Sequence, residues 1–164
     1  MTFDHLRVLR ALVEHEVRFV LIGGLAGRVH GSPSVTFDTD ICYERSTENL
    51  ELLVAVLREL GATLRGVDEG VPFLLDARTL RNGDNFTFET SAGPFDILGH
   101  PSGTAGYEDL VKGAVATDLG DDLAVLVVAL EDLIRMKQAA SRVKDRIELE
   151  YLYALRERIT RRDA

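Results

Sequence analysis

Two aspartates at alternate positions, Asp38 and Asp40, are the residues of this sequence with the clearest chemical potential. Side chains alternate across a β-strand, so both carboxylates should project from the same face of a strand that contains them. A strand rises roughly 3.3 Å per residue, which separates the two Cα atoms by about 6.6 Å. Two carboxylates at that spacing can bind a divalent cation that also binds substrate phosphate, as Mg²⁺ does. The alternative is a solvated strand end, because the pattern alone fits both.

A diglycine, Gly23-Gly24, precedes the aspartates and ends an apolar run at residues 17–22. Glycine lets the backbone approach phosphate oxygens closely, and the first amides of a following helix point at a bound anion. Arg28 lies between the two motifs, where it either adds positive charge for a triphosphate or is an ordinary surface arginine. Together, the diglycine and the aspartates favour a site for a nucleotide and its metal, as in a nucleotidyltransferase.

A third carboxylate, Asp96, lies between Phe95 and Ile97 in an expected strand. A charged residue inside an apolar strand is costly unless it is paired, hydrogen-bonded or bound to metal. Asp96 is therefore a candidate third metal ligand that also helps to deprotonate an attacking hydroxyl. The alternative is an aspartate at a strand edge that faces water.

Lys137 shares one helical stripe with the apolar residues Leu130, Leu133 and Ile134. An amine on that face needs an anion, either the carboxylate cluster or a bound phosphate, unless it extends to the surface. Asp145 follows in the first turn of the next expected helix, where a carboxylate also stabilises the helix dipole and so has a purely structural explanation.

The elements that must position these residues alternate between helix and strand. We expect strands at 18–22, 39–43, 63–65 and 123–129, a hairpin of strands at 85–90 and 93–98, and helices at 3–14, 24–30, 48–60, 131–140 and 142–159. Residues 107–112 fit a helical turn, and 71–80 fit either helix or strand. The pattern predicts an α/β (α+β) fold: one domain over 1–164 with a mixed sheet flanked by helices, its sheet core at about 17–129 and a helical part at 130–164.

Composition favours a cytoplasmic protein without a membrane segment. The chain has 164 residues, no apolar run near the length of a membrane span, no signal-peptide pattern and one cysteine, Cys42, which fits a reducing cytosol. A net charge of −8 argues mildly against a dedicated nucleic-acid binder. The segment 135–162 is nevertheless rich in lysine and arginine and can bind RNA locally. Tyr151 and Tyr153 within it are expected to be packing residues rather than a platform for bases.

Four segments of the sequence resemble the AbiEii/MenT-type nucleotidyltransferase toxins of the DNA-polymerase-beta-like superfamily. They read GGLAGRVHG, TFDTDI, FDIL and ALEDLIRMKQAASRVKDRIELEYL, and the resemblance spans residues 19–155. It implies a polymerase-beta-like minimal nucleotidyltransferase fold with C-terminal helices. The resemblance matches Gly23 and Gly24 to the nucleotide-binding turn, Asp38 and Asp40 to the metal pair, Asp96 to the third carboxylate, Lys137 to the phosphate-contacting lysine and Asp145 to a late essential aspartate.

The resemblance implies a toxin of a toxin–antitoxin system. Such an enzyme transfers nucleotides from an NTP to the 3′ end of tRNA with Mg²⁺ or Mn²⁺, which blocks aminoacylation and translation, and its partners are the tRNA acceptor end and a cognate antitoxin. The chain departs from the family at Ser34, where related sequences often have an arginine, and at Thr39, which replaces an apolar residue between the metal ligands.

Thr39 and Thr36 suggest a mode of regulation. Phosphorylating a hydroxyl beside two catalytic carboxylates would add about −1.5 to −2 charges and repel the triphosphate. A kinase-like antitoxin could therefore silence the enzyme at Thr39 or Thr36.

Three other functions fit the same residues. They are a small-molecule nucleotidyltransferase of the aminoglycoside-modifying type, a minimal nucleotidyltransferase that AMPylates a protein partner, and an inactive nucleotide-binding domain. The basic C-terminal segment favours a polyanionic acceptor over a cationic aminoglycoside. Retention of Asp38, Asp40, Asp96 and Lys137 together argues against the inactive domain.

Overall fold

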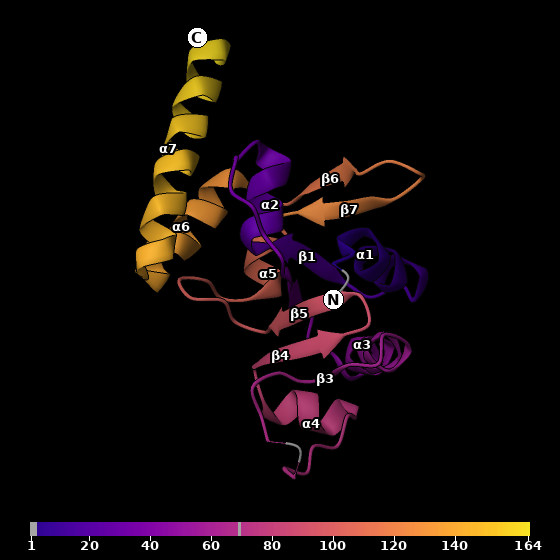
Figure 1. The fold of residues 1–164 in the computed structure, drawn as a ribbon. Helices are drawn as coiled ribbons and strands as arrows, with labels where there is room; N and C mark the ends of the chain where they lie inside the picture. The colour runs from indigo at the N-terminus through magenta and orange to yellow at the C-terminus, as the bar shows by residue number, and fades with distance from the viewer. Residues whose placement is uncertain (1–2, 69) are drawn as a thin grey trace.

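The computed structural model describes residues 3–68 and 70–164, and within these ranges seven strands form one mixed sheet. The strands are β1 (Phe19–Ile22), β2 (Thr39–Tyr43), β3 (Thr63–Leu64), β4 (Asn85–Thr90), β5 (Gly93–Leu98), β6 (Val115–Asp118) and β7 (Ala124–Val127). They lie side by side in the order β3-β4-β5-β2-β1-β7-β6. β2 runs parallel to β5 and antiparallel to β1, while β1 runs parallel to β7. The predicted mixed α/β fold is confirmed (Figure 1).

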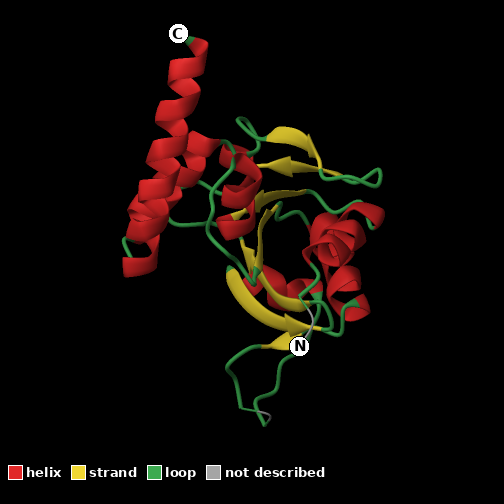
Figure 2. Ribbon diagram, turned by 45° about the horizontal axis from the view of Figure 1, so that its top comes forward, coloured by secondary structure: helices red, strands yellow, loops and turns green. Residues whose placement is uncertain are grey.

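Helices cover both faces of this sheet. They are α1 (His5–Glu14), α2 (Gly23–His30), α3 (Thr47–Glu59), α4 (Ala77–Asn82), α5 (Tyr107–Leu110), α6 (Leu130–Ala140) and α7 (Val143–Asp163). Figure 2 shows the sheet between α1 and α3 on one side and α2, α6 and α7 on the other. All four residues of β1 are buried as a result, which explains why this strand reads as a continuous apolar run.

The helix α3 shows how the sequence specifies an element. The Ser46 side chain accepts a hydrogen bond from the Asn49 amide and caps the helix, and Gly61 follows its end in the left-handed conformation. Apolar side chains at Leu50, Leu53 and Leu57 recur at helical spacing and are fully buried. A capping serine before the helix and a left-handed glycine after it are typical of helix ends in proteins.

Some elements differ from expectation. β6 was not expected, because the sequence Val-Ala-Thr-Asp is short, largely exposed and without alternation, and it becomes a strand only by pairing with β7. The ambiguous stretch 71–80 ends within α4 (77–82), where the Asp76 side chain accepts a hydrogen bond from the Thr79 amide and caps the helix. The last helix continues to Asp163, past the expected end at residue 159. Among the described helices, none combines the length and the apolar character that crossing a membrane requires.

A buried amide holds the two strands of the site against α3. Asn49 is fully buried, and its side-chain oxygen accepts a hydrogen bond from the Arg18 amide at 2.7 Å. Its side-chain nitrogen donates to the carbonyls of Arg18 and Glu44, at 3.0 and 2.7 Å. Arg18 precedes β1 and Glu44 follows β2, so one side chain ties both strand ends to the helix.

We therefore predict that Asn49→Ala lowers the free energy of unfolding by about 1–3 kcal/mol, because the Arg18 amide and the Glu44 carbonyl lose their partner and the Arg18 carbonyl keeps only the Glu44 amide. Urea denaturation measures this difference. The exposed Glu51 on the same helix supplies the control, since Glu51→Ala should stay within about 0.5 kcal/mol of wild type. Equal unfolding midpoints for Asn49→Ala and wild type would contradict the role given to this amide.

Candidate active site

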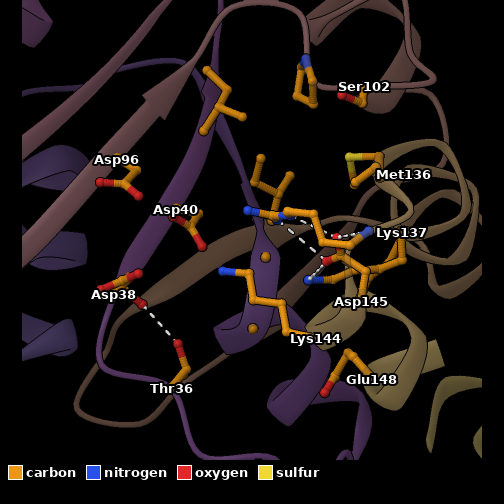
Figure 3. A pocket seen from close by; sticks show the side chains of 18 of the residues that line it. Thr36, Asp38, Asp40, Asp96, Ser102, Met136, Lys137, Lys144, Asp145 and Glu148 are labelled. Atoms are coloured by element: carbon orange, nitrogen blue, oxygen red, sulfur yellow. Dashed lines mark hydrogen bonds and ion pairs between the residues drawn. The ribbon is translucent and has the colours of Figure 1, made fainter. Parts of the chain in front are cut away.

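Three carboxylates converge where neighbouring strands meet. In the parallel pair of β2 and β5, Asp40 lies directly opposite Asp96, and Asp38 immediately precedes β2. The three side chains place one oxygen each within 4.8 Å of one another. Figure 3 shows all three bordering the same open space. The structure thus brings together the residues that the sequence predicted as metal ligands, and carboxylate oxygens are the donors that hard divalent cations prefer.

Thr39 lies between two of these residues but points the other way, as strand alternation requires. Its side chain is only 1% exposed, and its hydroxyl is 2.8 Å from Nδ1 of His5 in α1. The hypothesis of phosphorylation at Thr39 needs correction on this ground, because a kinase cannot reach a hydroxyl buried on the face opposite the carboxylates. Thr36 is partly exposed, borders the pocket and donates to the Asp38 carbonyl at 3.3 Å, so the hypothesis applies to Thr36 alone.

Crowding of the carboxylates perturbs their protonation. Burial, followed by the charges of Asp96 and Asp38, raises the pKa of Asp40 to about 7. Burial also raises the pKa of Asp96, although an ion pair with Arg65 opposes the shift. The donor set and the raised pKa of Asp40 both fit a divalent cation, since such an ion would compensate charges that the described side chains leave crowded.

Arg65 is a site residue that the sequence analysis missed. Its guanidinium lies 2.7 Å from an Asp96 carboxylate oxygen. The Arg65 amide donates to the Thr87 carbonyl, and Thr87 lies opposite Asp96, so Arg65 reaches Asp96 across β4. The sequence does not reveal this contact, because Arg65 is a single arginine after a two-residue edge strand and the contact depends on the register of three strands.

The diglycine makes room for the carboxylates. Gly23 has a φ of +71°, and a Cβ at this position would overlap the Asp40 carboxylate. A Cβ on Gly24 would lie 3.0 Å from the Thr36 side chain. Both glycines begin α2, and no side chain of the described residues caps its first amides. The N-terminus of α2 therefore opens beside the aspartates as a site for an anion.

Lys137 finds its anion in Asp145. Its amine lies 3.3 Å from one Asp145 oxygen, and Asp145 is fully buried. The other Asp145 oxygen accepts hydrogen bonds from the backbone amide and the Nε of Arg142, at 3.1 and 2.8 Å. Although burial alone would raise the pKa of Asp145, Arg142 and Lys137 hold it below its usual value. Asp145 thus positions Lys137 and caps α7, rather than joining the metal cluster.

These groups border one pocket of about 640 Å³, which is within the usual range for small-ligand sites. Every predicted site residue lines it except Thr39 and Arg28. Arg28 instead donates at 3.2 Å to the carbonyl of Ser34, which does line the pocket. Arg142 and Lys144 bring positive charge to the pocket in its place, and Figure 3 shows Lys144 extending across it toward the aspartates. Tyr151 also lines the pocket and is 40% exposed, so it is not the packing residue that was expected.

The fold is shared with nucleotidyltransferases of known structure. A lincosamide antibiotic adenylyltransferase, LnuA, solved with lincomycin bound, superposes with a TM-score of 0.64 at 12% identity, over 94% of this chain and 99% of that one. A proposed nucleotidyltransferase from Thermotoga maritima superposes with a TM-score of 0.57 at 16% identity, over 88% of this chain and 86% of that one. The antibiotic-resistance factor ANT(2″)-Ia superposes with a TM-score of 0.56 at 16% identity, over 95% of this chain and 89% of that one. No family model and no curated protein sequence matches the chain.

At these identities the likeness establishes the fold alone, which is one that nucleotidyltransferases of known structure share.

The raised pKa of Asp40 predicts how stability changes with pH. Between about pH 4 and pH 7 the folded protein keeps a proton on Asp40 that the unfolded chain releases. The free energy of unfolding of the metal-free protein should therefore fall as pH rises through this window and then level off. Asp40→Asn removes the titrating group, so this variant should lose less stability than wild type between about pH 5 and pH 8.

Urea unfolding with EDTA measures both proteins at the two pH values. Added Mg²⁺ should stabilise wild type more at the higher pH, because the ligand must be deprotonated. Parallel pH dependence of wild type and Asp40→Asn would contradict the assignment.

Proposed function

We propose that this protein is a metal-dependent nucleotidyltransferase that transfers a nucleoside monophosphate from an NTP to an acceptor hydroxyl. One observation carries the proposal: three carboxylates converge beside the uncapped start of α2 in the pocket that Lys137 also lines. This combination offers ligands for a cation and donors for a triphosphate in one cavity. We further propose that 1–164 act as one domain, in which the sheet supplies the carboxylates and the helices after residue 130 supply Lys137.

Each residue has a distinct role in the proposed reaction. Asp38, Asp40 and Asp96 hold a divalent cation, Mg²⁺ or Mn²⁺, which when bound supplies Lewis-acid polarisation of the phosphate oxygens. The amides of Gly23 and Gly24 bind phosphate oxygens at the start of α2. Lys137, Arg142 and Lys144 stabilise the negative charge that develops as pyrophosphate leaves.

The bond changes follow from these roles. The acceptor oxygen forms a bond to the α-phosphorus, and the bond from that phosphorus to the oxygen bridging to the β-phosphate breaks, so that pyrophosphate is the leaving group. The hydroxyl proton passes to Asp96, which Arg65 holds in place.

We propose the 3′ end of tRNA as the acceptor, with a cognate antitoxin that restrains the enzyme. The support is the sequence resemblance to nucleotidyltransferase toxins and the arginines at the outer end of α7. Its N-terminal turn brings Arg142 and Lys144 to the pocket, and its exposed outer end, which projects from the body in Figure 1, carries Arg156, Arg158, Arg161 and Arg162. Phosphates are the natural partners of such a helix.

A small hydroxylated molecule is the second candidate acceptor. The specific observation in its favour is the likeness to LnuA over nearly the full length of both chains. Val35, Ile147 and Tyr151 add apolar surface to the pocket, which suits a compact organic acceptor as well as a base.

Transfer assays test the proposal directly. We expect wild type to transfer label from an NTP with Mg²⁺. Asp40→Ala should lower kcat about 10²- to 10³-fold because a metal ligand is lost. Lys137→Ala should lower kcat about 10-fold or more, because the charge that develops as pyrophosphate leaves loses a cation. Lys112→Ala, at an exposed position outside the pocket, is the matched control and should behave as wild type.

The acceptor is identified by running each labelled NTP with total tRNA, with lincomycin, with an aminoglycoside and with cellular protein. Label at the tRNA 3′ end supports the first candidate, label in an antibiotic supports the second, and label in protein indicates AMPylation. Absence of label with every acceptor would refute enzymatic transfer and leave a binding domain.

A further inference from the structure

Glu148 in α7 is a buried carboxylate without a partner. The residue is only 7% exposed, and its Oε1 has no hydrogen-bond partner among the described residues. A buried carboxylate of this kind is costly unless it is paired, because it loses its hydration. The other buried acid of this helix, Asp145, is fully satisfied by Lys137 and Arg142. Glu148 therefore requires a separate explanation.

The fold makes room for this carboxylate without satisfying it. A Cβ on Gly27 of α2 would lie 2.8 Å from the Glu148 Oε1, so the absence of a side chain there accommodates the oxygen. Glu148 does not cap α7, since Asp145 has that role. Figure 3 shows Glu148 at the edge of the pocket, with its carboxylate directed away from the Lys137–Asp145 pair. Oε1 itself is buried against Gly27, but Glu148 lines the pocket, so a rotation of its carboxylate would present the unpaired acceptor to a ligand that carries hydrogen-bond donors.

The position of Glu148 narrows the choice of ligand group. The carboxylate lies beside Gly27, three residues along α2 from Gly24, which is about 4.5 Å of helix. Phosphates that bind at the start of α2 would be repelled by Glu148, and the metal ligands form their own cluster. The group that follows the α-phosphate in an NTP is the ribose, whose 2′ and 3′ hydroxyls are two adjacent O–H donors. Ile147 and Tyr151 flank Glu148 in the lining and offer apolar surface to the rest of the nucleoside.

We propose that Glu148 accepts hydrogen bonds from the ribose hydroxyls of the bound NTP and so selects ribonucleotides over deoxyribonucleotides. The proposal rests on the proposed function, since it names a subsite for the nucleotide in the same pocket. It explains why an unpaired buried carboxylate is retained: the cost in the free protein is offset when the sugar binds.

Equilibrium binding tests the assignment. Isothermal titration calorimetry compares each NTP with its 2′-deoxy and 3′-deoxy counterparts, with Ca²⁺ in place of Mg²⁺ to prevent turnover. Wild type should bind the ribonucleotide about 10-fold more tightly than either deoxy form. Glu148→Ala should weaken the ribonucleotide about 10-fold more than it weakens either deoxy form, because a deoxy form has only one hydroxyl contact to lose, so that the preference disappears. Glu148→Gln, which keeps one acceptor oxygen, should retain part of the preference.

Two controls exclude a structural role. The exposed Glu150 on the same helix is the matched site, and Glu150→Ala should keep the wild-type preference. In the nucleotide-free state Glu148→Gln should melt at or above the wild-type Tm, because an unpaired buried charge is removed. A clear fall in Tm, or equal weakening of ribose and deoxyribose forms in Glu148→Ala, would assign Glu148 to the fold and overturn the proposal.

The outcomes for wild type separate this inference from the proposed function. Binding of triphosphates without a preference for ribose would overturn the role of Glu148 alone. Failure of wild type to bind any triphosphate would overturn both.

Discussion

Mutual repulsion of three carboxylates is the constraint around which this molecule is arranged. Asp40 and Asp96 lie opposite each other because β2 and β5 run parallel in a fixed register, and Asp38 precedes the same strand. Backbone hydrogen bonds hold these side chains together although burial and like charge oppose it, which the raised pKa of Asp40 reflects. The sheet tolerates this electrostatic repulsion because its strand register is set by the packing of its apolar faces and not by the carboxylates.

The surroundings of the cluster follow from the same register. Ile22, the last residue of β1, lies opposite Asp40, so α2 must begin beside that carboxylate. Only a residue without a side chain fits at Gly23, where φ is also positive. Positively charged side chains approach the carboxylate cluster from two sides. Arg65 crosses β4 to reach Asp96, and the corner between α6 and α7 delivers Lys137. Asp145 fixes that corner, because it binds Lys137 and caps α7 at once.

The part of the site that lies on the sheet could be predicted from the sequence, because it depends on local strand geometry. Alternation along a strand predicted that Asp38 and Asp40 share a face, and the structure bears this out. The same rule implies that Thr39 faces α1, a consequence that the phosphorylation hypothesis overlooked. What escaped prediction depends on tertiary placement. Arg65 needs the register of three strands, β6 exists only through its partner, and the exchange of Arg28 for Lys144 depends on where α7 packs. Residue type alone carries none of this information.

The division between sheet and helices also bears on how such a protein acquires its acceptor. The carboxylates and the diglycine lie on backbone whose geometry the sheet register dictates, so few substitutions there are tolerable. The opposite wall, from α6 and α7, consists of side chains on helix surfaces, such as Lys144, Glu148 and Tyr151, which can change without disturbing that register. The chain shares its fold with a lincosamide adenylyltransferase at 12% identity, so this fold tolerates extensive change of sequence. Under the proposed function, strand pairing holds the metal-binding carboxylates, and the helix surfaces are where recognition of the acceptor can diverge.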